Sequence, residues 1–201
     1  MVNILCGLGN PGLRYQNTRH NIGFEAIERL TERYPVIESG RANGFAFQKI
    51  ATTVDDWFLV KPETFMNRSG WAAVEALTMF NAEPAQLFVI VDDFNIPLGR
   101  IRLRRSGSDG GHKGLISIIE SLETDCFPRL RLGIGPLPEY CRENTDLIPE
   151  FVLGTFSQSE REIVDKMITL GIEALVELID HGLEPAIRQF NNRNVFPTPD
   201  Q

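Results

Sequence analysis

Short apolar runs that predict β-strands recur along the whole chain. The first, at residues 2–8, is an apolar run that glycines end. Residues 100–104 alternate arginine with apolar residues, which predicts a strand with one basic, solvated face and one apolar face. Residues 129–134 repeat this alternation. The other predicted strands are 45–53, 57–61 and 87–91.

Helical periodicity separates these strands. Residues 22–34 place apolar side chains on one face and stop at a proline, and Ser157 begins an amphipathic pattern that reaches about residue 180. Further helices are expected at 69–80, with Ser69 as its cap, at 115–122 and at 185–191. Residues 136–149 contain three prolines and are expected to form a loop. Because strands and helices interleave, the pattern predicts an α/β fold with a mixed sheet.

Composition narrows the class of protein. A chain of 201 residues suits a single domain, and 42% hydrophobic with 23% charged residues is typical of a globular chain. No run approaches the roughly 18 apolar residues of a membrane span, and the N-terminus lacks the features of a signal peptide. The three cysteines are never spaced Cys-x-x-Cys, so we expect no disulfide framework and a reducing, cytoplasmic setting.

Charge is segregated along the sequence. The net charge of −7 argues against a protein that coats nucleic acid indiscriminately. Residues 100–113, however, hold five basic side chains and one acid, whereas residues 157–190 hold seven acids and three basic side chains. Alternating arginines beside the Gly-rich loop at 107–114 favour a contact with a phosphate backbone, although a solvated strand face and a flexible connector would look the same.

The glycines after the first strand allow two interpretations. Gly7-x-Gly9-x-x-Gly12 formally matches a dinucleotide-binding fingerprint and would make the chain a nicotinamide-dependent oxidoreductase. The segment that follows is polar, however, and the helical pattern begins only at Ile22, so we favour a tight turn. Such a turn would present Asn10 at the carboxyl end of a strand, where α/β sheets bind ligands.

Candidate chemistry centres on one histidine and one carboxylate. His20 lies in a dense polar segment, and histidine is the side chain best suited to accept a proton near neutral pH. Asp92 and Asp93 follow a predicted central strand, where they could support such a base, cap a helix or simply face water. A hydrolase that uses both carboxylates is a further interpretation of this pair. The three histidines lie far apart in sequence and form no ligand motif, so we expect no metal and no cofactor.

Another irregular polar segment lies between a strand and a helix, at residues 61–70. Asn67 can donate and accept hydrogen bonds, and Phe65 or Met66 could pack on a base or a substrate. Capping of the following helix by Asn67 or Ser69 explains the segment equally well.

Taken together, these segments resemble the bacterial-type peptidyl-tRNA hydrolase family over roughly residues 2–190. The motifs that carry the resemblance are Gly7-Leu-Gly-Asn-Pro-Gly12, Tyr15-x-x-Thr-Arg-His-Asn-x-Gly-Phe24, Lys61-Pro-x-Thr-Phe-Met-Asn-x-Ser-Gly70, Asp92-Asp-x-x-x-Pro-x-Gly99, Gly110-Gly-His-x-Gly-Leu115, Arg129-Leu-Arg-Leu-Gly-Ile-Gly-x-Pro and Phe151-Val-Leu-Gly-x-Phe156. They occur in this order, and several are long and specific.

The resemblance implies a cytoplasmic, monomeric, metal-free esterase with no obligate protein partner. It would be a single α/β domain, with helices on both faces of a twisted mixed sheet, that cleaves the ester linking a peptide to the 3′-terminal ribose of tRNA. We expect residues 1–191 to form this catalytic domain and residues 192–201 a frayed tail. A catalytically silent RNA-binding relative, similar to organellar splicing factors, is the alternative.

Residue roles also follow from the resemblance. His20 would activate water, Asp92 would support its basic form, and Asn10 would lie near the scissile ester and help to recognise an N-blocked substrate. The positions expected to bind the substrate or the tRNA are Tyr15, Phe65, Met66, Asn67, Lys113, Arg102, Arg104, Arg129 and Arg131. Lys113 replaces the asparagine usual in the family, so it would act on phosphates as a point charge.

Overall fold

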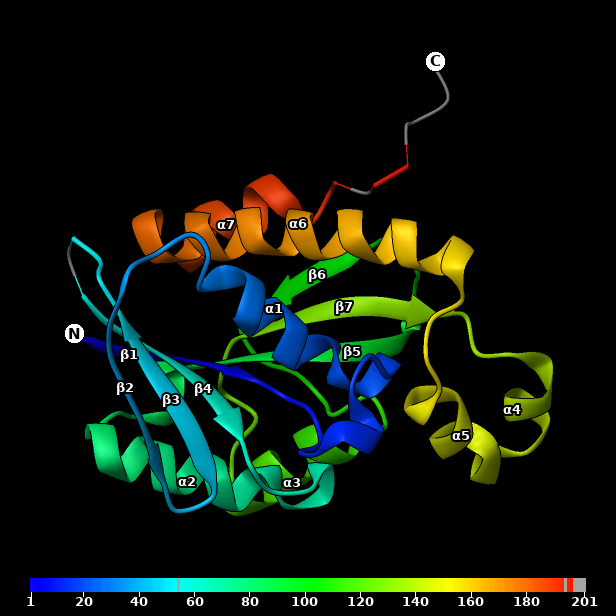
Figure 1. Ribbon diagram of the computed structural model, residues 1–201, viewed down its shortest axis with the longest axis horizontal. Coiled ribbons are helices and arrows are strands. Elements are labelled where there is room, and N and C mark those ends of the chain that lie inside the picture. Colours follow the sequence, from blue (N-terminus) through cyan, green and yellow to red (C-terminus); the bar gives the residue numbers. More distant parts are fainter. Residues whose placement is uncertain (54, 194, 197–201) are drawn as a thin grey trace.

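A computed structural model describes residues 1–53, 55–193, 195 and 196, and its core is one seven-stranded sheet (Figure 1). The strands are β1 (Val2–Gly7), β2 (Val36–Ala42), β3 (Phe45–Ile50), β4 (Asp56–Pro62), β5 (Leu87–Pro97), β6 (Ile101–Arg104) and β7 (Arg129–Gly135). They lie in the order β2-β3-β4-β1-β5-β7-β6, with β4, β1, β5 and β7 parallel and the outer strands antiparallel. The predicted mixed sheet is therefore confirmed.

Helices cover both faces of the sheet, as expected. On one face lie α1 (Ile22–Leu30), α6 (Gln158–His181) and α7 (Leu183–Phe190), and on the other lie α2 (Ser69–Phe80) and α3 (Lys113–Leu122) (Figure 1). Each face has its own apolar core, and the middle strands contribute side chains to both. This double burial explains why the sequence of β5 begins as a continuous apolar run rather than an alternating one. None of the helices in the described ranges combines the length and apolarity needed to cross a membrane.

Several predicted boundaries differ from the structure. The edge strand β2 was not predicted, because most of its residues face solvent and it lacks an apolar alternation. Strand β5 runs on to Pro97, past the predicted end at residue 91. Ser69 is the first residue of α2 rather than its cap, and its hydroxyl donates to the Met66 carbonyl oxygen.

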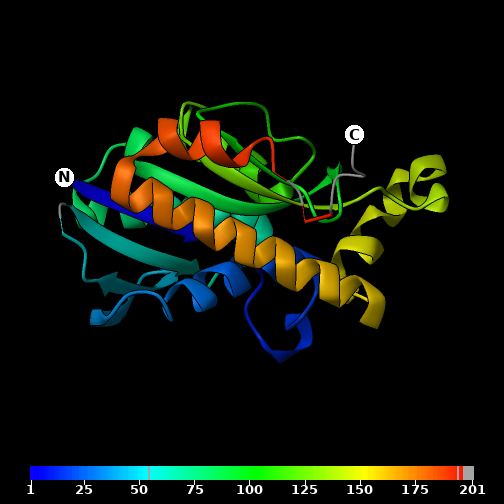
Figure 2. The ribbon, with the colours of Figure 1, turned by 90° about the horizontal axis from the view of Figure 1, so that it is seen from above.

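The prediction of a loop at residues 136–149 is wrong. Residues 136–156 form what we call the arm, which contains α4 (Glu139–Glu143), the 3-10 turn η5 (Thr145–Leu147) and α5 (Ile148–Leu153). Two of the three prolines lie at or before a helix start, where the missing amide hydrogen is tolerated. In both views the arm extends past the end of the sheet (Figures 1 and 2).

Close packing of α1 on β1 explains the first glycines. A Cβ atom on Gly7 would lie 2.3 Å from the carbonyl oxygen of Gly23, so the helix can approach the strand only without side chains there. Helix α1 begins at Ile22, well beyond Gly12, and the segment that follows Gly12 directly is a three-residue 3-10 turn, Leu13–Tyr15. The dinucleotide-binding interpretation therefore lacks its helix. Of the expected tail, residues 194 and 197–201 lie outside the described residues, and the Val195 amide donates to the Gly99 carbonyl oxygen at 3.3 Å.

Candidate active site

The site forms where two parallel strands end at the same edge of the sheet. Gly7 of β1 is in register with Ile90 of β5, so the turn that carries Asn10 lies beside the segment that carries Asp92. Open α/β sheets bind ligands at such an edge. The one-turn helix η2 (Arg19–Asn21) then brings His20 onto this edge, and His20, Asp92 and Asn10 are all buried.

Two histidines share one carboxylate oxygen. His20 Nδ1 lies 2.8 Å from Asp92 Oδ1, and His112 Nε2 lies 3.0 Å from the same oxygen. The two imidazole rings are 4.8 Å apart between centroids. Asp92 is 2% exposed, so the carboxylate has little contact with solvent. The expected support of His20 by Asp92 has the right geometry, and His112 is an additional partner.

The protonation states follow from these contacts. The amides of Gly114 and Leu115, at the start of α3, donate to His112 Nδ1, so His112 carries its proton on Nε2 and donates it to Asp92. An ionised Asp92 accepts from His20 as well, which places the His20 proton on Nδ1. Nε2 of His20 is then the nitrogen left to take a proton, and the ring lines a cavity.

Burial and hydrogen bonding act in opposite directions on this cluster. Burial alone would raise the pKa of Asp92, but the two imidazole partners hold that pKa well below its usual range. Burial lowers the pKa of His112, against the pull of Asp92. The carboxylate therefore stays charged and His112 stays neutral near pH 7, so Asp92 can accept a hydrogen bond from each of the two rings.

The same three side chains could hold a metal, since their ligand atoms all lie within 4.8 Å of one another. A metal on His112 Nε2 would force the ring proton onto Nδ1. That proton would remove the acceptor for the first amides of α3. The hydrogen bonds of the cluster therefore suit proton transfer better than metal ligation.

Asn10 is held from two sides. Its backbone amide donates to Asn21 Oδ1 at 2.8 Å, and Asn21 Nδ2 donates to the Asn10 carbonyl oxygen at 2.9 Å. The amide of Met66 donates to Asn10 Oδ1, also at 2.8 Å. Asn10 lines the cavity, and because its Oδ1 already accepts from Met66, its Nδ2 hydrogens are the side-chain group left to donate to a substrate.

A cavity of about 570 Å³ surrounds these groups. The one-turn helix η3 (Met66–Arg68) and the residue before it supply one wall, with Phe65, Met66 and Asn67. Lys113 lines another part, and the arm contributes apolar side chains that include Ile148, Val152 and Leu153. Of the nine expected binding residues, Phe65, Met66, Asn67 and Lys113 thus line the same cavity as His20, Asp92 and Asn10. Tyr15 lies outside the cavity lining, with its ring against that of Phe65 at 6.2 Å.

The strand arginines fall into two groups. Arg102 and Arg104 of the edge strand β6 face solvent, as the alternation predicted, and their contact with phosphates stays a prediction. Arg129 is fully buried, and its guanidinium donates to carbonyl oxygens that include Gly107 and Asp125, so the expectation that it contacts RNA is wrong. Arg131 is 9% exposed and donates to Asp93 Oδ2 at 2.9 Å, so a phosphate would have to compete with this carboxylate.

The sequence did not single out three parts of this site. His112 was read only as one of three distant histidines, although it lies inside the quoted motif Gly110-Gly-His-x-Gly-Leu115. Asn21 follows His20 directly and was not assigned a role. Residues 136–149 of the arm were taken as a loop, because the helices there are too short to establish a period.

Comparison with known proteins gives one consistent result. The sequence model of a family described as peptidyl-tRNA hydrolase matches residues 4–198. A peptidyl-tRNA hydrolase of Prosthecochloris aestuarii is 42% identical over 188 residues, 94% of this chain and 95% of that protein. One of Synechocystis sp. is 41% identical over 196 residues, 96% of this chain and 98% of that protein. A crystal structure of peptidyl-tRNA hydrolase from Acinetobacter baumannii superposes with a TM-score of 0.87 at 29% identity, covering 96% of each chain.

Proposed function

Because the chain belongs to the peptidyl-tRNA hydrolase family, we propose that it releases tRNA from peptidyl-tRNA with His20 as the general base. The bond cleaved is the ester between the peptide and the 3′-terminal ribose. The observation that carries the assignment is the 2.8 Å contact between His20 Nδ1 and Asp92 Oδ1, because it leaves the other nitrogen of a ring that lines the cavity free to act as the base.

In this mechanism a water molecule in the cavity attacks the ester carbonyl carbon. His20 Nε2 takes the proton of the water, and Asp92 stabilises the imidazolium that forms. Collapse of the tetrahedral intermediate breaks the bond to the ribose 3′-oxygen, which receives the proton from His20. The products are a peptide with a free carboxyl group and a tRNA with a free 3′-hydroxyl. A positioned base of this kind accounts for roughly 10²- to 10⁴-fold of the rate.

Asn10 supplies the complementary group. Its Nδ2 is the side-chain donor left for a substrate, and its oxygen and backbone are fixed by Met66 and Asn21. We assign Nδ2 to a carbonyl oxygen of the substrate, where a donor placed in advance stabilises developing negative charge. Asn67 lines the same cavity and is the second candidate donor.

Replacement of His20 tests the proposal. His20→Ala should abolish hydrolysis of an N-acetyl-aminoacyl-tRNA while filter binding of tRNA survives. His181→Ala is the matched control, because the His181 side chain is 63% exposed on α6 and its Nδ1 pairs with Glu177 of the same helix. Turnover at the wild-type rate by His20→Ala would refute the assignment. A wild-type chain that binds tRNA without turnover would favour the RNA-binding alternative.

Three finer statements belong to the same proposal. We propose that residues 1–191 act as one catalytic domain, that it works as a monomer without an obligate protein partner, and that it works in the cytoplasm. The relatives are named for peptidyl-tRNA, which is made during translation, and this supports the cytoplasmic setting. Light scattering at micromolar concentration tests the monomer, and hydrolysis in the presence of EDTA tests the proposed independence from metal.

A further inference from the structure

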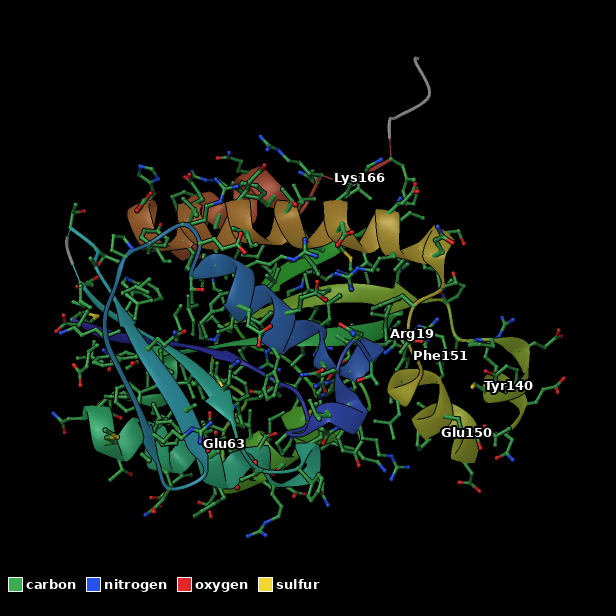
Figure 3. The ribbon with its side chains drawn as sticks, in the orientation of Figure 1. Arg19, Glu63, Tyr140, Glu150, Phe151 and Lys166 are labelled. Carbon is green, nitrogen blue, oxygen red and sulfur yellow. The ribbon has the colours of Figure 1, made fainter. Side chains whose placement is uncertain are left out.

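The residue before His20 connects the catalytic turn to the arm. Arg19 Nη1 donates to the carbonyl oxygen of Thr155 in the arm at 2.8 Å, and Nη2 donates to both carboxylate oxygens of Glu160, in the first turn of α6, at 3.0 Å. The guanidinium also lies 4.6 Å from the ring centre of Phe151 and 5.0 Å from that of Phe156. Figure 3 shows Arg19 and Phe151 close together where the arm meets the body. Only 11% of the Arg19 side chain is exposed, so these contacts form a largely buried network rather than a surface ion pair.

The backbone reinforces the connection. The amide of Arg19 donates to the Gly154 carbonyl oxygen at 2.9 Å, and Thr18 forms an isolated β-bridge with Thr155. Within the described ranges, all side-chain hydrogen bonds between the arm (residues 136–156) and the rest of the molecule come from Arg19. Apolar contacts of Phe151 and Val152 complete the attachment. Arg19 is therefore the polar link between the arm and the turn η2.

The arm and His20 line one cavity. Ile148, Val152 and Leu153 of the arm line the same cavity as His20. Successive residues of a 3-10 turn point about 120° apart, so Arg19 can reach the arm while His20 reaches Asp92. A displacement of the arm would therefore change the space between its apolar wall and the base.

We propose that Arg19 is a positioning residue, which sets the distance between His20 and the apolar wall that receives the acyl group of the substrate. The inference rests on the proposed function. Misplacement of reacting groups by about 1 Å can lower a rate roughly 10²-fold. Loss of Arg19 should therefore lower kcat by about 10- to 100-fold. KM should change little, because the arginines that we expect to bind the tRNA lie on β6 and not on the arm.

The test compares Arg19→Gln with Arg161→Gln. Arg161 also forms ion pairs, with Glu25 and Asp165, and within the described ranges none of its ion pairs or side-chain hydrogen bonds reaches the arm. Both variants should melt at lower temperature. Below the melting transition only Arg19→Gln should lose kcat on N-acetyl-aminoacyl-tRNA, and only it should show faster amide exchange in the arm. Arg19→Lys should recover part of kcat, because an ammonium group can pair with Glu160 but cannot lie flat between two rings.

If Arg19→Gln does not fold, Glu160→Gln replaces it. A glutamine at this position keeps the capping box with Ser157 and removes the ion pair, so kcat should fall in the same direction. Faster exchange in the arm with an unchanged kcat would overturn the inference, because it would show a purely structural role. A wild-type chain without turnover would instead refute the proposed function and the inference together, so the two failures can be told apart.

Discussion

Replacing Asp92 with asparagine tests the support that His20 receives. The substitution keeps the size of a side chain that is 2% exposed, and it leaves an oxygen that can accept from His20. It removes the negative charge 2.8 Å from Nδ1 of the ring that becomes an imidazolium. Hydrogen bonds to charged groups contribute about 1.5–3 kcal/mol. Since about 1.4 kcal/mol corresponds to a tenfold change in rate, kcat should fall roughly 10- to 150-fold.

The matched control is Asp93→Asn. Asp93 is also buried, but its carboxylate accepts from Arg131 at 2.9 Å and from the amide of Asn95 at 2.8 Å, and it does not line the cavity. Its variant should lose stability, because the buried Arg131 loses its ionic partner. Well below its melting temperature it should keep kcat within about threefold of the wild type, since a buried pair that does not line the cavity acts mainly on folding.

The assay is hydrolysis of an N-acetyl-aminoacyl-tRNA under saturating substrate, with circular dichroism to confirm that each variant is folded. The reasoning is refuted if Asp92→Asn retains kcat within a factor of two, or if Asp93→Asn is the slower enzyme. The second result would mean that the wrong carboxylate was assigned to His20.

Three other predictions concern stability and tRNA binding. Because the folded state lowers the pKa of Asp92, the ionised carboxylate stabilises the fold above about pH 4, and this stabilisation is lost as the pH falls further. Urea titrations between pH 7 and pH 3 should therefore show a steeper loss of unfolding free energy for the wild type than for Asp92→Asn. Gly70→Ala should destabilise the protein by roughly 3 kcal/mol, because the new Cβ would lie 2.1 Å from a backbone oxygen of α3. Gly171→Ala should change stability by less than about 1 kcal/mol, because the nearest atom to its new Cβ is a movable leucine methyl at 3.2 Å. Thermal melts of both variants test these values. Arg102→Gln should reduce the slope of log K against log salt for tRNA binding by about 1 and leave kcat unchanged.

The sequence predicted the elements that have a strong period or a continuous apolar run. Helix α6 and strand β6 lie where periodicity placed them, because burial on one defined face gives a readable pattern, and β1 lies where its continuous apolar run placed it. Strand β2 was missed because it is a solvent-facing edge, stabilised by backbone pairing with β3 rather than by apolar side chains. The helices of the arm have five and six residues, which is less than two turns, so no period can be read from them.

The site was predicted in part for a different reason. Asn10 and Asp92 could be placed together because parallel strands end at one edge, a rule that needs only the order of strands. His112 could not be placed in this way. It reaches Asp92 from a glycine-rich loop whose course depends on contacts that are remote in sequence. The three histidines are therefore far apart in the sequence, although two of them, His20 and His112, share one carboxylate oxygen in the structure.

Burial also changes the meaning of the arginine pattern. The alternation in β6 and β7 looks the same in the sequence, but β6 is an edge strand and β7 lies inside the sheet. The arginines of β7 turn to the carbonyl oxygens of the glycine-rich loop: Arg129 donates to Gly107, and Arg131 donates to Ser108.

This difference determines which charges can meet a tRNA. Of the four arginines in β6 and β7, only the two of β6 face solvent, while those of β7 hold the loop that carries His112. Burial and the nearby Arg131 lower the pKa of Arg129 to about 10, which still leaves it charged near pH 7. Phosphate contact by the strands thus depends on few side chains, so the salt dependence of tRNA binding should be shallow. The acidic total of −7 does not oppose this, because screening confines each phosphate contact to charges within about 10 Å.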